Sequence, residues 1–214
     1  MLRRCDRIGT IVASAVHRRV TSGAQVTLKW PNDVLIDGEK VSGVLIEIED
    51  GVLFVGIGCN VVSAPLVSAL GPNGARPATC LAAHNEAIAA YIEQENSTPS
   101  FNQVVDVAGG PQPSTDIGPG GSPLREGDFH KELAIEICAA VHNWVQAQSD
   151  SSALVLTDFE RNLDRSPQKL RDGNNNAVAG GEEVLPISVN SDGTLRVKST
   201  VSGVERTLVA DYLW

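Results

Sequence analysis

Apolar residues near the N-terminus recur every three or four positions, which is the period of a helix with one buried face. Between Arg7 and Val20 these residues are Ile8, Ile11, Val12, Ala15, Val16 and Val20. Gly23 follows at the kind of position where helices commonly end. The pattern predicts an amphipathic helix over residues 7–20, and its apolar face must be covered by another element.

Short apolar runs bounded by turn residues follow this helix and predict strands over residues 25–30, 34–36, 40–49 and 52–62. Asp-Gly dipeptides separate the last three runs, which is typical of hairpins. Within the longest strand, Val44, Ile46 and Ile48 share one face, and Leu45, Glu47 and Glu49 share the other. Connections this short disfavour parallel crossovers. We therefore predict an antiparallel meander with an apolar side that the first helix covers.

Two further helices are expected, over residues 78–93 and 129–148, with Asp128 as the N-cap of the second. The apolar stripe of the second helix consists of Leu133, Ile137, Ala140, Val141 and Trp144. Residues 95–128 hold five of the eleven prolines, six of the twenty glycines and one basic residue, and they show no apolar period. Such a composition predicts a mobile insertion. A loop is expected over residues 73–76.

The C-terminal segment predicts three short strands, over residues 184–189, 194–199 and 205–209, joined at Asp192-Gly193 and Ser202-Gly203. A piece of this size made of short hairpins suggests a small barrel that packs on the main domain. We place the boundary between the two domains at residues 165 and 166.

Charge and cysteine content narrow the function classes. The 214 residues include 17 basic and 26 acidic side chains, and the net charge of −9 argues against nucleic acid as the main ligand. No apolar run is long enough to span a membrane. The four cysteines form no CxxC pair, which fits reduced thiols in an intracellular protein. A cytoplasmic location is expected, with a mitochondrial one left open by the arginines that flank the first helix.

The remaining candidate chemistry lies in the meander, because the sequence contains no P-loop, GxGxxG, GxSxG or HExxH motif. Lys29 and Lys40 are isolated cations, since no Lys or Arg occurs from residue 41 to residue 75, and either can pair with a carboxylate or phosphate. Glycines 43, 56 and 58 leave the sheet bare for a flat ligand. Asn60 can read an adenine edge or a phosphate, and Asp33 can hold Mg²⁺. An edge lysine, strand bulges and a simple Asn-Asp turn are the structural alternatives.

Three motifs in this region resemble the catalytic core of biotin protein ligases. They are K-W-P-N-D at residues 29–33, G-E-K-V-S-G-V-L-I-E at 38–47 and G-I-G-C-N-V at 56–61, in the family's order and at close spacing. The resemblance continues more weakly over residues 129–144 and over 184–214, which is similar to the family's SH3-like domain. It implies an α+β fold with a mixed or antiparallel sheet packed on helices and a small C-terminal SH3-like barrel.

The resemblance also implies a reaction, in which biotin and ATP form biotinyl-adenylate and the biotinyl group passes to a lysine of a carboxylase's biotin carboxyl carrier domain. Lys40 would hold the biotin carboxylate and the adenylate phosphate. Asp33 would place Lys40 or bind Mg²⁺. The other residues that would bind biotin or the nucleotide are Lys29, Trp30, Asn32, Gly43, Gly58 and Asn60. The sequence leaves a homodimer open, and no nucleic-acid or membrane partner is expected.

One feature of the family is not found in the sequence. The family's G-R-G-R-x-G-R loop, which folds over the adenylate, precedes K-W-P-N-D, and none of the 28 residues before Lys29 form it. We therefore expect little biotin-dependent ATP–pyrophosphate exchange from residues 1–214 alone. A non-catalytic relative that binds biotin, nucleotide or a carrier, and a lipoate ligase, are the alternatives. K-W-P-N-D and the barrel-like tail favour biotin.

Overall fold

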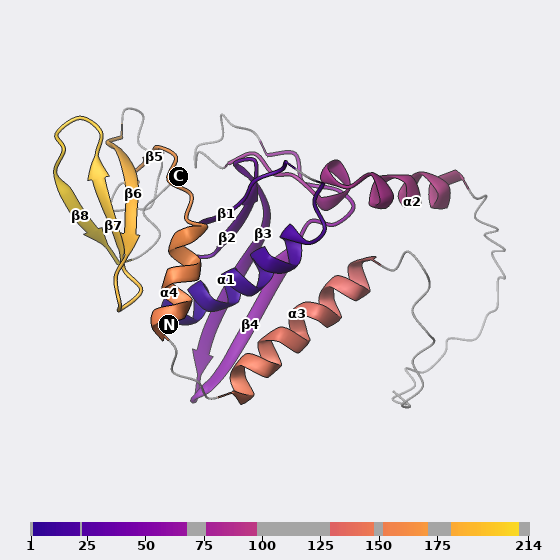
Figure 1. Ribbon diagram of the computed structural model, residues 1–214, viewed down its shortest axis with the longest axis horizontal. Coiled ribbons are helices and arrows are strands. Elements are labelled where there is room, and N and C mark those ends of the chain that lie inside the picture. Colours follow the sequence, from indigo (N-terminus) through magenta and orange to yellow (C-terminus); the bar gives the residue numbers. More distant parts are fainter. Residues whose placement is uncertain are drawn as a thin grey trace, which may run out of the picture.

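The structure is a computed structural model, and it describes residues 2–21, 23–67, 76–97, 129–147, 152–170 and 181–209. Two antiparallel sheets and several helices make up the described fold (Figure 1). The first half contains α1 (Leu2–His17), β1 (Val26–Lys29), β2 (Asp33–Ile36), β3 (Glu39–Glu49), β4 (Val52–Cys59) and the 3₁₀ turn η1 (Leu81–His84). The second half contains α2 (Glu86–Ser97), α3 (Phe129–Gln146), α4 (Ser152–Arg161), β5 (Gln168–Lys169), β6 (Glu183–Val189), β7 (Leu195–Ser199) and β8 (Glu205–Leu208).

The predicted meander is confirmed as a four-stranded antiparallel sheet in the order β1-β2-β3-β4. Its two Asp-Gly turns adopt the left-handed conformation that tight hairpins require. Asp37 and Gly38 have φ of 50° and 85°, and Asp50 and Gly51 have φ of 49° and 79°. The local sequence at these turns therefore sets the pairing of β2, β3 and β4.

The amphipathic helix α1 lies across one face of this sheet, with α3 and α4 packed against it (Figure 1). Ile8, Val12 and Val16 of α1 are fully buried, and so are Val44 and Ile46 of β3. The helix begins five residues before the predicted start and ends at His17. On the opposite face of the sheet, Leu45 and Phe54 are 59% and 51% exposed.

The predicted helix over residues 78–93 is wrong at its start. Ala78 pairs instead with Lys40, a 3₁₀ turn follows, and α2 begins at Glu86. Asn85 caps α2, because its Oδ1 accepts hydrogen bonds from the N–H groups of Ala87 and Ile88. The short strand β5 and helix α4 were not predicted. Of the predicted insertion, residues 95–97 belong to α2, and residues 98–128 lie outside the described residues, as do 73–75 of the predicted loop.

The three predicted C-terminal strands are confirmed as β6, β7 and β8, and β5 joins them at one edge. The second sheet is an open antiparallel meander within the described residues, and its closure into an SH3-like barrel stays a prediction. Hydrogen bonds join it to the turn before β2 and to α4. The indole Nε1 of Trp30 donates to the Gly193 carbonyl at 2.9 Å, and Glu160 of α4 accepts from the Val189 N–H at 2.8 Å. None of the helices within the described residues is both long and apolar enough to cross a membrane.

Candidate functional site

Lys40 and Asp33 form an ion pair at the end of the first sheet. Their Nζ and Oδ1 atoms lie 2.5 Å apart, and the Lys40 side chain is 43% exposed while that of Asp33 is 14% exposed. A bulge between Val34 and Leu35 shifts the pairing of β2 and β3, so that Lys40 lies opposite Leu35 while Asp33 lies opposite Gly43. The bulge therefore brings the lysine near the row of the sheet that contains Asp33.

That row crosses all four strands. Lys29, Asp33, Gly43 and Gly58 lie opposite one another in successive strand pairs, and directly opposed residues share a face. A Cβ on Gly43 would lie 3.2 Å from both Cε and Nζ of Lys40, so the lysine stem passes directly over this glycine. A Cβ on Gly58 would meet nothing within 4 Å. The glycines thus form an open floor beside an ammonium group.

This floor lies on the face that carries Leu45 and Phe54, both of which are more than half exposed. Leu45 pairs with Gly56, and Glu47 pairs with Phe54 further along the same two strands. The face therefore combines bare backbone, exposed apolar side chains and one accessible cation. Such a surface suits a flat ligand with an apolar body and an anionic end.

The other residues of the K-W-P-N-D turn attach it to β3 and pack in the protein interior, whereas Asp33 forms the ion pair. The Asn32 amide Nδ2 donates to the Val44 carbonyl at 2.9 Å, and the Val44 N–H donates to the Asn32 carbonyl at 2.8 Å. Trp30 and Lys29 are only 1% and 5% exposed. Asn32 thereby fixes the turn against β3, and the roles of Lys29, Trp30 and Asn32 in ligand binding stay predictions.

Asn60 lies next to Lys40 through a segment that the sequence did not assign to the site. Its Nδ2 donates to the carbonyl of Thr79 at 3.0 Å and lies 3.5 Å from the Lys40 carbonyl. Thr79 is buried, and its N–H donates to Lys40. No sequence signal identified Thr79, because its neighbours have the composition of a helix. The role of Asn60 toward a nucleotide stays a prediction.

The described residues offer a metal ion few ligands. No group of three or more His, Cys, Asp or Glu side chains among them is arranged to bind one. Asp33 supplies one carboxylate, and its Oδ1 is already paired with Lys40. The thiol of Cys59 lies on the α1 side of the sheet, and burial raises its pKa to about 11, so it stays protonated. A protein-only metal site therefore does not fit this arrangement, whereas Mg²⁺ that is carried mainly by phosphates does.

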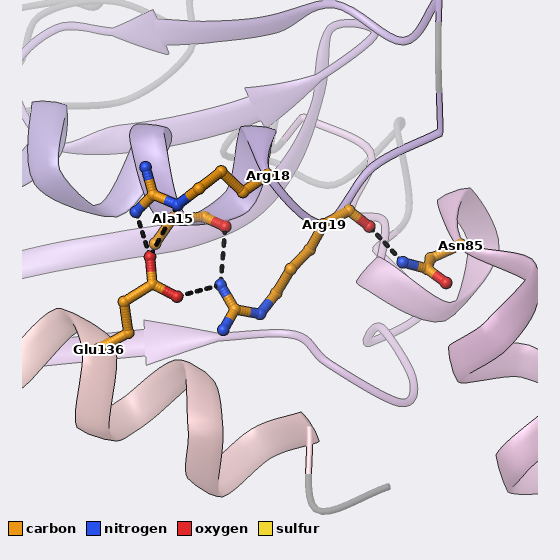
Figure 2. A network of polar contacts seen from close by, with 5 residues as sticks. All are labelled: Ala15, Arg18, Arg19, Asn85 and Glu136. Carbon is orange, nitrogen blue, oxygen red and sulfur yellow. Dashed lines mark hydrogen bonds and ion pairs between the residues drawn. The ribbon is translucent and has the colours of Figure 1, made fainter.

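A network of charged side chains links the end of α1 to α3 and to the start of α2 (Figure 2). Arg18 and Arg19, at the end of α1, both bind the carboxylate of Glu136 on α3. Arg19 also donates to the Ala15 carbonyl, and its own carbonyl accepts from the side chain of Asn85. Burial raises the pKa of Glu136, but the hydrogen bonds from Arg18 and Arg19 outweigh it and lower the pKa overall.

A separate hollow of about 520 Å³ lies between α1, β1 and the C-terminal end of α4. His17, Val26 and Arg161 are among its lining residues, and none of the predicted site residues is. The hollow is lined by residues of the helix-covered side and of the β1 edge. We place the candidate site on the open face because the cation and the bare backbone occur there together.

Comparison with protein families supports the resemblance over the segment that contains every predicted site residue. Residues 3–61 match the model of the Biotin/lipoate A/B protein ligase family. The biotin–[acetyl-CoA-carboxylase] ligase of Paracoccus denitrificans is 41% identical over 59 residues, which cover 25% of each chain. That of Mycobacterium tuberculosis is 48% identical over 42 residues, which cover 20% of this chain and 16% of the relative. The chain thus spans a quarter or less of these curated relatives.

Solved structures show the same fold over a larger part of the chain. The apo biotin protein ligase of Aquifex aeolicus is 17% identical with a TM-score of 0.56, covering 100% of this chain and 74% of that one. The Aquifex aeolicus enzyme in complex with biotin and ATP is 18% identical with a TM-score of 0.52, covering 98% and 72%. The predicted α+β arrangement of antiparallel sheets and helices is therefore confirmed as the fold of biotin protein ligases.

Proposed function

We propose that this protein acts as a biotin protein ligase, forming biotinyl-AMP from biotin and ATP and transferring the biotinyl group to a carrier lysine. One observation carries this proposal. The Lys40 ammonium is held by Asp33 over Gly43, beside an open glycine floor, within the segment that matches the family. This arrangement offers an accessible cation to an acyl-adenylate whose flat body covers the floor.

In the first step, a biotin carboxylate oxygen attacks the α-phosphorus of ATP, and pyrophosphate leaves. Both reacting groups are anionic, so their approach needs a fixed positive charge and a fixed orientation. Lys40 supplies the charge, since its ammonium projects to the open face. In the second step, the amine of the carrier lysine attacks the acyl carbonyl, forming an amide and releasing AMP and a proton.

The remaining predicted residues receive supporting roles in this proposal. Gly43 and Gly58 form the floor, Asn60 and Asn32 contact the nucleotide, and Lys29 and Trp30 complete the binding region. Mg²⁺ enters with the ATP phosphates as part of the substrate, with Asp33 as the protein carboxylate nearest to it. The carrier is the biotin carboxyl carrier domain of a biotin-dependent carboxylase.

Several finer features belong to the same proposal. We place the division between a catalytic part and an SH3-like barrel at residues 165 and 166. The proposed location is cytoplasmic, and the proposal makes no choice between a monomer and a homodimer. The strand order β5-β6-β7-β8 of the second sheet supports the proposed barrel, and residues beyond Val209 lie outside the described part of the chain.

The test is direct transfer. The chain, alone and extended by an upstream segment that carries the G-R-G-R-x-G-R loop, is incubated with biotin, ATP, Mg²⁺ and an apo carrier domain, and the carrier's mass is measured. Little transfer is expected from residues 1–214 alone, and the added loop should restore it. An ATP-dependent gain of one biotinyl group that is lost in Lys40→Ala supports the proposal. Binding of a non-hydrolysable biotinyl-adenylate analogue without transfer, even when the loop segment is present, supports the non-catalytic relative instead. Preference for the lipoyl-adenylate analogue supports a lipoate ligase.

A further inference from the structure

The segment of residues 77–82 runs between the start of β3 and the end of β4; it is extended as far as Cys80 and enters the 3₁₀ turn η1 at Leu81. The Lys40 N–H donates to the Pro77 carbonyl, and the Thr79 N–H donates to the Lys40 carbonyl, both at 2.9 Å. At the other side of the segment, Leu81 and Ala82 donate to the carbonyls of Asn60 and Val61, also at 2.9 Å. Both polar groups of the Lys40 backbone are therefore bound by this segment.

The centre of the 77–82 segment is held by His84. Thr79 is 5% exposed, and its hydroxyl shares a hydrogen bond of 2.9 Å with the imidazole Nε2 of His84. On the other side of the ring, Nδ1 lies 3.9 Å from the Asp37 carboxylate. A carboxylate that faces Nδ1 favours the proton on that nitrogen, which leaves Nε2 to accept the Thr79 hydroxyl proton.

The backbone at His84 is anchored to the end of α1 and, through Arg19, to α3. The His84 carbonyl accepts from the Thr21 N–H at 2.8 Å, and the next residue, Asn85, donates to the Arg19 carbonyl at 2.6 Å. Arg19 binds Glu136 of α3 (Figure 2). Hydrogen bonds and the backbone of residues 84 and 85 thus link α1 and α3 to the His84 ring, and from there through Thr79 to the backbone of Lys40.

We propose that His84 is a positioning residue that acts on Lys40 through Thr79. By holding Thr79, it keeps the Lys40 backbone where the ammonium lies over Gly43. Loss of the imidazole leaves a buried hydroxyl without its partner and loosens the segment that binds Lys40. Because the ligand that meets Lys40 comes from the proposed function, the effect of His84 on ligand binding rests on that function.

The first part of the test needs no ligand. Amide hydrogen exchange is measured in the whole chain for the wild type, His84→Ala, His84→Gln and Thr79→Val. We expect exchange at the amides of Lys40 and Thr79 to be at least tenfold faster in His84→Ala and Thr79→Val than in the wild type. His84→Gln, whose amide reaches a similar position, retains slow exchange, and so does His142→Ala, which removes an exposed histidine of α3. Wild-type exchange at Lys40 in both His84→Ala and Thr79→Val overturns the inference.

The second part of the test is titration with a non-hydrolysable biotinyl-adenylate analogue. We expect His84→Ala to weaken binding threefold to tenfold and His84→Gln to restore it. In a Lys40→Ala background the same change has no further effect, because residues that act through one another are not additive. Unchanged affinity in His84→Ala, or an equal loss in both backgrounds, overturns the inference. A wild type that does not bind the analogue refutes the proposed function instead, and exchange at Lys40 still decides whether His84 positions it.

Discussion

The ammonium of Lys40 lies 2.5 Å from a carboxylate oxygen of Asp33, and the lysine stem passes so close over Gly43 that a Cβ there would lie 3.2 Å from it. The cation is thereby held in place before any ligand arrives. Holding a long side chain in one conformation removes part of the entropy loss that a ligand would otherwise have to offset. The glycine and the aspartate thus act on binding through the position of the lysine.

Replacement of this lysine should have the largest effect on ligand binding. A hydrogen bond to a charged group contributes about 1.5–3 kcal/mol, so we expect Lys40→Ala to weaken binding of a biotinyl-adenylate analogue at least about tenfold. Calorimetric titration measures the change. Lys198→Ala, which removes an exposed lysine of β7, is the matched control and should bind as the wild type does. Equal affinities for the two variants would make Lys40 an ordinary surface lysine.

The two floor glycines should respond differently to the same substitution. In Gly43→Ala the new methyl group lies 3.2 Å from Lys40 Nζ, so the end of the lysine side chain must shift slightly even in the free protein. In Gly58→Ala the methyl group meets open space, so the free protein is unaffected. We expect both variants to weaken binding of the analogue, by about tenfold for Gly43→Ala, because a loss of about 1.4 kcal/mol has that effect.

Nitrogen-detected spectra of the lysine ammonium groups show whether a substitution displaces Lys40 in the free protein or only hinders the ligand. A shifted Lys40 signal is expected in free Gly43→Ala and an unshifted one in free Gly58→Ala. An unshifted signal in Gly43→Ala would contradict the proposed contact. Gly58→Ala with wild-type affinity would show that the ligand does not lie over this part of the sheet.

The sequence predicted the meander because its determinants are local. Asp37-Gly38 and Asp50-Gly51 select tight hairpins, and the alternation of Val44, Leu45 and Ile46 sets which face is buried. It also predicted that Lys40 and Asp33 belong together, through the resemblance of their motifs. The structure places them in contact, and their roles toward a ligand await the experiments above.

The start of the helix predicted over residues 78–93 was wrong because the conformation of the 77–82 segment depends on partners far away in the sequence. Its alanines and leucine favour a helix by intrinsic propensity. Backbone hydrogen bonds to Lys40 and Asn60 hold it out of an α-helix, extended as far as Cys80 and in a 3₁₀ turn from Leu81. Strand β5 and helix α4 were missed for a related reason, since two residues of strand and ten of helix carry little periodic signal on their own.

Because Asp6 is buried, we expect the free energy of unfolding to depend on pH in an unusual way. It is fully buried in α1, and neither of its carboxylate oxygens has a hydrogen-bond partner among the side chains that the structure describes. Burial raises its pKa from 3.8 to about 8, so the folded protein keeps the proton that the unfolded chain has lost. The contribution of Asp6 to the free energy of unfolding therefore falls progressively from about pH 4 to about pH 8, and changes little above that.

Urea denaturation of Asp6→Asn tests this dependence, because the amide has the same shape and no charge. We expect the variant to exceed the wild type by at least about 1 kcal/mol at pH 8, with a smaller difference at pH 5, because one unit of pKa shift corresponds to about 1.4 kcal/mol. Glu47→Gln, which neutralises an exposed carboxylate of β3, should show no such difference. Parallel pH profiles for wild type and Asp6→Asn would refute the buried protonated state.

For Glu136 we expect the opposite dependence of the free energy of unfolding on pH. Arg18 and Arg19 lower its pKa in the folded protein despite its partial burial. The stabilisation is therefore present above the usual carboxyl pKa and is lost as the pH falls through the lower folded value. We expect Glu136→Gln to reduce the free energy of unfolding by about 1 kcal/mol at pH 7 and by little near pH 3. Asp158→Asn, which breaks an exposed pair with Arg161 on α4, should cost less than about 0.5 kcal/mol at either pH.

The contact between Trp30 and Gly193 predicts that the second sheet supports the candidate site. Trp30 is 1% exposed, and its Nε1 donates to the buried Gly193 carbonyl, while Asp33 begins β2 only three residues later. Trp30→Phe keeps an aromatic ring but leaves that carbonyl unpaired and opens a cavity. We expect a loss of about 2–4 kcal/mol in the free energy of unfolding.

The matched control for this variant is Trp144→Phe, which changes a partly buried tryptophan of α3 and should cost about half as much or less. If the hydrogen bond between Trp30 and Gly193 fixes the position of Asp33, Trp30→Phe also weakens binding of the biotinyl-adenylate analogue under conditions where the variant is fully folded. The expected mechanism is a displaced Asp33 that no longer holds Lys40 over Gly43. Equal losses of stability in the two variants, with unchanged affinity in Trp30→Phe, would show that the second sheet packs on the first without supporting the ion pair.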